Sequence, residues 1–365
     1  MKPVKLPPPT AEPRVRQSNL ALFRVVAMLL IVAHHYVVNS GLLTEMMKEP
    51  SSLHSLSYLW FGMWGKTGIN CFMMITGYFM CKSDITMKKL VKLLTQIYFY
   101  KMVIFLIFLF TGYEQLTASR LLRLLSPVWG FNTDFVSCFI LFFLTIPFWN
   151  ILIRHINQRQ HLYLMALLVG GFSLLPTYPD FVVTNNYVVW FGVIYVVASY
   201  IRLYPVRWFE KRALWGWLTV ALILLTVMST WVISSRYAVR AGEVGEWQMY
   251  KYLAYFVYES TMFMPLCIGV SSFLFFKNLQ MPYIKAINIV GASTFGVLLI
   301  HANSNAMRQW LWQDVVDCVG HYASNVFIYP LCAVIIIFTL CILIDRLRIL
   351  FIEKQLLNFL CPTKV

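Results

Sequence analysis

The chain has 365 residues, of which 59% are hydrophobic and 12% are charged, and its mean hydropathy is +0.68. These values exclude a soluble domain and indicate an all-α membrane protein with many spans. The formal net charge of +15 would suggest nucleic acid in a soluble protein, but here the positions of the charges matter more than their sum, and no nucleic-acid partner is expected.

Three regions are predicted along the chain. Residues 1–18 are basic and proline-rich, and we expect them to form a cytoplasmic tail. Residues 19–350 form the membrane domain, and residues 351–365 form a second cytoplasmic tail. Hydropathy predicts ten spans, at residues 19–40, 58–81, 88–111, 133–153, 160–177, 181–201, 213–234, 249–276, 286–303 and 324–345.

The loop charges predict the orientation of these spans. With ten spans, both termini lie on one side of the membrane, together with twenty Lys and Arg residues, whereas six lie on the other side. Cytoplasmic loops are enriched in Lys and Arg, so the N- and C-termini are both expected in the cytoplasm.

The first predicted span carries Arg24 and the pair His34 and His35. Eleven positions at about 100° per residue return to within about 20° of the same helix face, so Arg24 and His35 share one side. They are separated by about 16 Å along the axis, with Arg24 toward the cytoplasm and His35 toward the exterior. Two interpretations stay open: Arg24 is a surface anchor and the histidines pack in the interior, or these residues form a functional site.

The second span places Lys66, Asn70 and Gly77 on one helical face, which suits either helix packing or a site. The basic stretch that follows contains Lys89 and Lys92. This stretch is either a cytoplasmic surface anchor or a patch for an anionic ligand such as a nucleotide phosphate.

The later spans add two ionisable groups. Glu259 is expected inside the eighth span, where it needs a partner that the sequence does not identify. His301 ends the ninth span at the exterior, followed by Asn303 and Arg308, and is either a surface residue or a catalytic one. The eight cysteines lie mostly in apolar segments without a CxxC spacing, so we expect small core residues and no metal site.

Four stretches, taken in order, resemble the acyltransferase-3 family of bacterial integral-membrane acyltransferases, especially small members that O-acetylate surface carbohydrates. They are LFRVVAMLLIVAHHY with Arg24 and His35, GKTGINCFMMITGYFM with Thr76, the LTIPFWN stretch with Pro147 and Asn150, and TFGVLLIHANSNAMRQWLW with Leu298. The resemblance covers nearly the whole chain and implies the ten-helix architecture of that family.

The resemblance also implies roles for individual residues. His35 would serve as the base for an acceptor hydroxyl or carry the acyl group, and Arg24 would bind the phosphates of cytoplasmic acetyl-CoA. Lys89 and Lys92, which stand where arginines are often found, would assist Arg24. Contacts to the substrate or the oxyanion are expected from Asn70, Thr76, Lys66 and His301.

The implied reaction is O-acyl transfer to a hydroxyl of a surface polysaccharide or a lipid-linked glycan. The expected setting is the plasma (inner) membrane of a bacterium, with membrane lipid, the carbohydrate acceptor and glycan-assembly proteins as partners and with no metal. No serine-hydrolase motif, metal-ligand spacing or P-loop is present.

Two alternatives belong to other classes. A multi-span transporter or exporter would place Arg24, Lys66 and Glu259 along a permeation path, but the sequence shows neither inverted repeats nor the glycine- or proline-broken helices of such carriers. An inactive scaffold in a glycan-assembly complex is the third reading.

Overall fold

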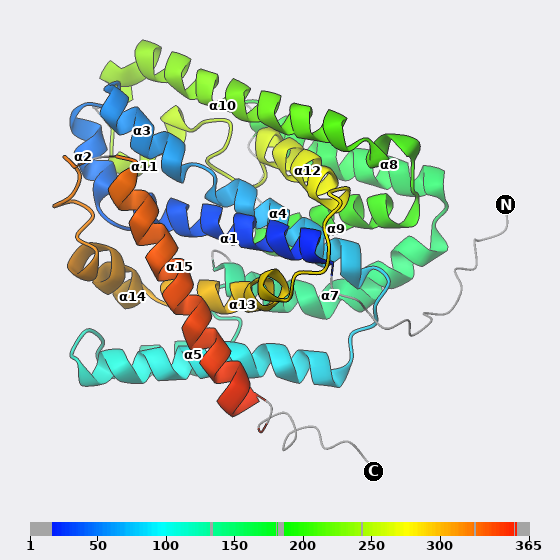
Figure 1. Ribbon diagram of the computed structural model, residues 1–365, viewed down its shortest axis with the longest axis horizontal. Coiled ribbons are helices and arrows are strands. Elements are labelled where there is room, and N and C mark those ends of the chain that lie inside the picture. Colours follow the sequence, from blue (N-terminus) through cyan, green and yellow to red (C-terminus); the bar gives the residue numbers. More distant parts are fainter. Residues whose placement is uncertain are drawn as a thin grey trace.

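The computed structural model describes residues 17–131, 134–179, 181, 186–241, 244–324, 326–353 and 355. The predicted tails at 1–18 and 351–365 therefore lie mostly outside the described residues. Within the described ranges the chain is built of helices without strands (Figure 1), which confirms the all-α prediction.

The helices are α1 (Ser18–Val38), α2 (Leu42–Lys48), α3 (Leu53–Gly62), α4 (Gly65–Met80), α5 (Met87–Phe110), α6 (Ala118–Leu125), α7 (Phe135–His155), α8 (Gln158–Val169), α9 (Tyr187–Leu203), α10 (Arg212–Ala241), α11 (Glu246–Leu253), α12 (Phe263–Lys277), α13 (Lys285–His301), α14 (Asn305–Gln309) and α15 (Ile328–Arg348). Short helical turns follow α8 over Gly170–Thr177, α14 over Trp310–Val315 and α15 over Ile349–Glu353.

Several helices are suited to the bilayer by length and composition. In the described part of the chain, six are long and apolar enough to cross it, at Ser18–Val38, Met87–Phe110, Phe135–His155, Gln158–Thr177, Arg212–Arg236 and Ile328–Glu353. The number rises to seven if Lys285–His301 and Asn305–Val315, which meet at a bend of 98°, count as one span. Helices α9 and α12 are apolar but shorter. These features indicate a multi-pass membrane protein.

Two predicted spans are not continuous helices. The span predicted at 58–81 is divided, because α3 ends at Gly62 and α4 begins at Gly65. The span predicted at 249–276 is divided by turns over residues 254–262, so the prediction that Glu259 lies inside a helix is wrong. Pro265 fits the second break, since proline is tolerated in the first turn of α12 but would disrupt a helix interior.

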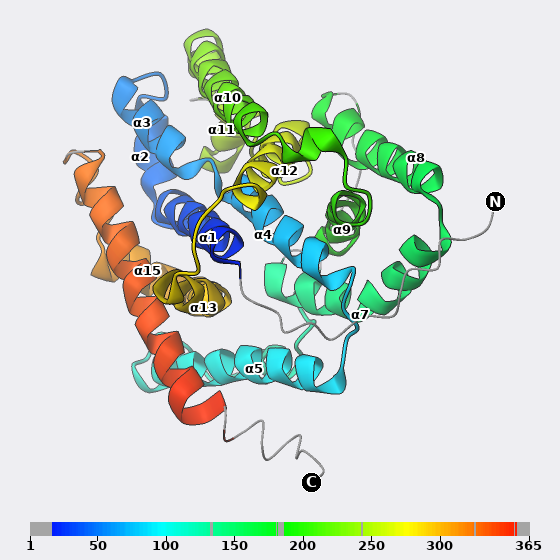
Figure 2. The ribbon, with the colours of Figure 1, turned by 45° about the vertical axis from the view of Figure 1, so that its right-hand side comes forward.

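Helix α1 lies in the middle of the bundle, between α4 and α13 (Figure 2). Two glycines permit this close packing. A Cβ at Gly68 of α4 would lie 2.7 Å from the carbonyl oxygen of Ala27, and one at Gly291 of α13 would lie 2.9 Å from that of Ala21. Small residues at such crossings let membrane helices approach closely, and here they bring three helices together around α1.

Helices α4 and α9 approach each other in the same way through Gly77. Replacing Gly77 by Val is expected to destabilise the protein by about 1 to 3 kcal/mol through overpacking. A Cβ there would lie 2.8 Å from Cβ of Ala198 and 3.2 Å from Cα of Tyr195. Thermal unfolding in detergent measures the effect, and Gly170→Val is the matched control because no atom lies within 4 Å of its Cβ position. Equal losses in the two variants would contradict the packing argument.

Candidate active site

A polar cavity of about 260 Å³ opens beside the last turns of α1. It is lined by α1, the start of α4, one face of α5, the segment that begins α7, and the α13–α14 region. Its polar and ionisable lining residues are His34, His35, Asn39, Lys66, Lys101, Asp134, Ser137, Tyr187, Asn303 and Arg308. Several ionisable side chains in one cavity of a membrane protein mark a candidate functional site.

His35 is joined to His301 by a hydrogen bond of 2.9 Å between Nδ1 of His35 and Nε2 of His301. His301 is fully buried, and its own Nδ1 lies 2.6 Å from the carbonyl oxygen of Val297. His301 is not among the lining residues, so it supports His35 from behind the cavity wall.

These two contacts determine the tautomers of the neutral rings. A carbonyl oxygen only accepts, so Nδ1 of His301 carries a proton and its Nε2 is an acceptor. Nδ1 of His35 must then donate to that Nε2, which leaves Nε2 of His35 with its lone pair. That nitrogen has no hydrogen-bond partner among the described residues. The arrangement prepares His35 to accept a proton from a group bound in the cavity.

His34 has a different environment from its neighbour. Its side chain is buried, and Nδ1 donates to the carbonyl oxygen of Gly62 over 2.7 Å. A Cβ at Gly65 would lie 2.3 Å from Cγ of His34, so the glycine leaves room for the imidazole. His34 therefore satisfies a carbonyl at the end of α3 and holds α1 against the break between α3 and α4.

Lys66 lies on the cavity wall and has three polar contacts. Its ammonium donates to Tyr187 Oη over 2.7 Å and lies 3.3 Å from each carboxylate oxygen of Glu259. The exposed fraction of the Lys66 side chain is 15%. The partner that the sequence did not identify for Glu259 is thus Lys66, and the break before α12 brings the carboxylate to it.

Asn70 and Thr76, the other two predicted contacts, lie away from the cavity. Asn70 is fully buried, donates to the carbonyl oxygen of Ser260 over 2.8 Å, and accepts from Trp190 Nε1 over 2.9 Å. The Thr76 hydroxyl donates to the carbonyl oxygen of Phe72 in its own helix. Neither residue lines the cavity, and their contact with substrate stays a prediction.

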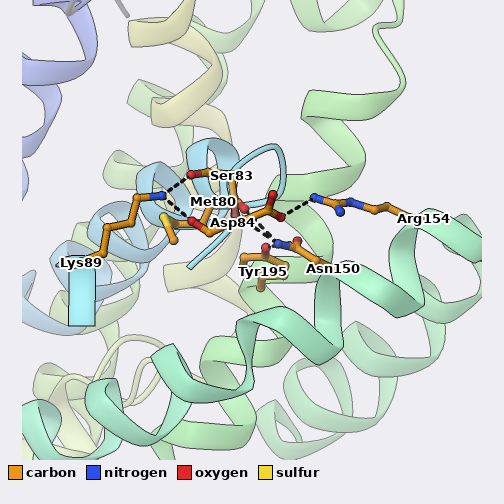
Figure 3. A network of polar contacts seen from close by, with 7 residues as sticks. All are labelled: Met80, Ser83, Asp84, Lys89, Asn150, Arg154 and Tyr195. Carbon is orange, nitrogen blue, oxygen red and sulfur yellow. Dashed lines mark hydrogen bonds and ion pairs between the residues drawn. The ribbon is translucent and has the colours of Figure 1, made fainter. Parts of the chain in front are cut away.

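The predicted donor-binding lysines lie at the opposite end of α4 from the cavity. There Lys89 donates to Ser83 Oγ over 2.6 Å and to the carbonyl oxygen of Asp84 over 2.5 Å (Figure 3). Asn150, from the LTIPFWN stretch, donates to the carbonyl oxygens of Met80 and Ser83. The residues form a network that fixes the turn between α4 and α5.

Two further contacts complete this network. Tyr195 Oη donates to Asn150 Oδ1 over 2.6 Å, and Arg154 forms an ion pair of 3.2 Å with Asp84 (Figure 3). Asn150, which belongs to a stretch that carries the family resemblance, therefore has hydrogen-bond partners that stabilise the fold. It ties α7 and α9 to the end of α4.

Lys92 and Arg24 occupy separate surroundings. Lys92 forms an ion pair of 2.5 Å with Glu353, which also binds Arg348 over 2.8 Å, so Lys92 links α5 to the end of α15. Arg24 is half-buried on α1, about 16 Å along the axis from His35, and it does not line the cavity. The structure brings His35, His301 and Lys66 together and leaves Arg24, Lys89 and Lys92 at the other end.

Some cavity residues were not predicted as site residues. Lys101, Asp134, Tyr187 and Arg308 come from segments far apart in the chain. Lys101 could have been predicted as a site residue from the sequence, because it lies inside the third predicted span, where charged residues are costly and commonly functional. Arg308 lies in the stretch TFGVLLIHANSNAMRQWLW that carried the family resemblance, whereas Asp134 and Tyr187 carry no signal in the sequence alone. No group of three or more His, Cys, Asp or Glu residues that could hold a metal is found among the described residues.

Fold and site together define a helical membrane protein with a histidine pair beside a polar cavity. The chain matches a family model described as "Acyltransferase domain" over residues 18–346. It therefore belongs to the acyltransferase-3 family and is a membrane acyltransferase. Neither a search of curated proteins nor a search of solved structures returned a match.

The hydrogen bond between the two histidines leads to a test of His301 as a positioning residue. His301→Ala is expected to lower kcat for acyl transfer by about 10²-fold, because Nδ1 of His35 loses the acceptor that fixes its tautomer. His301→Gln should retain more activity than His301→Ala, since the glutamine Oε1 can accept the same hydrogen bond. Steady-state kinetics of the purified variants measure both, and equal losses in Ala and Gln would refute the positioning role.

Proposed function

We propose that the protein is an O-acetyltransferase that moves an acetyl group from cytoplasmic acetyl-CoA to a hydroxyl of a surface polysaccharide or a lipid-linked glycan. The observation that carries this proposal is the chain of contacts from His35 to His301 and the Val297 carbonyl, which assigns a lone pair to Nε2 of His35 on the wall of a polar cavity. Membership of the acyltransferase-3 family supports acyl transfer as the reaction class.

The chemistry requires a base, a bound thioester and stabilisation of an oxyanion. Nε2 of His35 takes the proton of the acceptor hydroxyl as the oxygen attacks the thioester carbonyl. The tetrahedral oxyanion then collapses, the C–S bond breaks, and the proton passes from His35 to the departing thiolate of coenzyme A. His301 keeps the imidazole of His35 oriented throughout and shares its positive charge through the hydrogen bond.

The donor is proposed to enter from the end of α1 that carries Arg24. A guanidinium can bind phosphate oxygens in a bidentate manner, and Lys89 and Lys92 add positive charge at the same end of the bundle. The narrow pantetheine arm would extend along α1 toward His35. This route assumes ten spans with both termini in the cytoplasm, in the plasma membrane of a bacterium, as the positive charges of the loops suggest.

A transporter is the less favoured reading. The structure does contain broken helices, at α3–α4, α11–α12 and α13–α14, and such breaks are common in carriers. However, the break between α11 and α12 brings Glu259 next to Lys66, and the two form an ion pair. This pairing uses two of the three charges that a transporter would place along a permeation path. The family match over nearly the whole chain favours acyl transfer.

The role of His35 is tested in cells. His35→Ala is expected to reduce the acetyl content of the surface glycan to background, because a base contributes about 10²- to 10⁴-fold to such reactions. Base-labile acetate released from the isolated glycan measures it, with membrane abundance checked for each variant. His155→Ala is the matched control, because this histidine is exposed on α7 outside the cavity. Normal acetylation by an abundant His35→Ala protein would overturn the assignment.

The donor site is tested separately. Arg24→Ala is expected to raise KM for acetyl-CoA by about tenfold or more, which corresponds to the loss of one charge-assisted phosphate contact. Arg24→Lys should be intermediate, because it retains the charge but loses the bidentate geometry. Arg212→Ala, an exposed arginine at the start of α10, is the control. An unchanged KM for acetyl-CoA in a stable Arg24→Ala protein would remove Arg24 from the donor site.

A further inference from the structure

The cavity beside His35 carries more positive than negative charge. Lys66, Lys101 and Arg308 line it, whereas Asp134 is the single lining carboxylate among the residues that the structure describes. Lys66 has its own counter-ion, Glu259, which is not among the lining residues. Lys101 and Arg308 have no carboxylate within 4.0 Å in the described ranges, so their charges are not neutralised by direct ion pairs.

Lys101 is held in place by neutral groups. Its ammonium donates to the carbonyl oxygens of Arg123 and Ser126, over 2.7 and 3.0 Å. Both acceptors lie at the end of α6, so they hold the ammonium of Lys101 between α5 and the end of α6. These carbonyls orient the ammonium without neutralising its charge, and Lys101 is one of the residues that line the cavity.

Arg308 uses little of its hydrogen-bonding capacity. Its contacts to Asn305 Oδ1 and to the carbonyl oxygen of Ala302 are long, at 3.4 and 3.5 Å. Its Nε is buried and has no partner in the described part of the chain. A guanidinium has five N–H donors, and leaving the buried Nε–H without a partner costs free energy unless a ligand accepts from it.

Asp134 does not fill this role. Its carboxylate accepts from the backbone N–H of Ser137 over 2.9 Å and from the Ser137 hydroxyl over 2.8 Å, and it thereby caps α7. One carboxylate oxygen, Oδ2, therefore serves the helix end, and in the described ranges neither Lys101 nor Arg308 lies within 4.0 Å of the carboxylate. Among the described residues, Arg308 therefore has no anionic partner at ion-pair distance.

We propose that Arg308, assisted by Lys101, binds an anionic group on the acceptor, a carboxylate or a phosphate, and so selects acidic glycans over neutral ones. The proposal rests on the function proposed above. A guanidinium matches the planar, bidentate geometry of such anions, and a cleft lined by positive charge concentrates anionic substrates. Because Arg308 and His35 line one cavity, an anion held by Arg308 places a neighbouring hydroxyl near the base.

The test uses three acceptors that share sugar hydroxyls: methyl glucuronide, glucose 1-phosphate and methyl glucoside. In the reconstituted protein with labelled acetyl-CoA, at least one anionic acceptor is expected to show a KM about tenfold below that of methyl glucoside. Comparison of the carboxylate and the phosphate identifies which anion is preferred. Arg308→Gln should remove this preference by raising KM for the anionic acceptor toward the KM for methyl glucoside.

A second measurement does not depend on turnover. The preferred anionic sugar is expected to raise the unfolding temperature of the wild-type protein, and not that of Arg308→Gln, while Arg308→Lys keeps part of the effect. Arg236→Gln, an exposed arginine on α10, should behave as wild type. Anion-dependent stabilisation without any acetyl transfer would count against the proposed function alone.

Other outcomes overturn the role of Arg308. Equal KM values for the three acceptors, together with equal stabilisation by charged and neutral sugars, would show that the cavity does not select anions. A fall in kcat with all three acceptors in Arg308→Gln, without a change in KM, would assign Arg308 to the oxyanion of the reaction instead.

Discussion

The hydrogen bond between His35 and His301 is the interaction on which the rest of the site depends. It joins α1 to α13 across 266 positions of sequence, with 2.9 Å between Nδ1 of His35 and Nε2 of His301. Near the other end of the same helix pair, Gly291 permits close packing, because a Cβ there would lie 2.9 Å from the carbonyl oxygen of Ala21. The tautomer of the His35 imidazole thus depends on the packing that brings His301 of α13 next to it.

Irregular backbone at the predicted membrane depth positions two of the polar contacts around the cavity. A bilayer tolerates broken helices only where protein or an aqueous cavity satisfies the freed groups. The break between α3 and α4 gives Gly62 a free carbonyl, which His34 satisfies. The break before α12 brings Glu259 to Lys66. Without these breaks, continuous helices would carry the same charged and polar groups at other depths and on other helix faces.

Local periodicity allowed part of this arrangement to be predicted from sequence. The shared face of Arg24 and His35 follows from helix geometry alone, and His35 does line the cavity. The partner of His35 could not be deduced in the same way, because His301 meets it only through tertiary packing. The turn around Glu259 was missed because hydropathy averaged over a window cannot detect a few irregular residues between apolar segments.

The same limit applies to the lysines after α4 and to Asn70. Spacing placed Lys89 and Lys92 near one another, but it could not show that Lys89 stabilises a turn or that Lys92 reaches Glu353. Asn70 lies on the predicted face of α4, yet its amide is used by Trp190 and Ser260. Regular spacing therefore does not show whether a polar side chain in a membrane helix serves helix packing or belongs to a site. Its hydrogen-bond partners show which of the two roles it has.

The protonation of the histidine pair can be measured directly by ¹⁵N NMR of histidine-labelled protein in lipid nanodiscs, with His35→Gln and His301→Gln used for assignment. In the resting protein both rings are expected to be neutral, with protonated Nδ1 and unprotonated Nε2. If Nε2 of His35 carries a proton, it has no lone pair with which to take the proton of the substrate hydroxyl. That result would contradict the arrangement from which the whole mechanism follows.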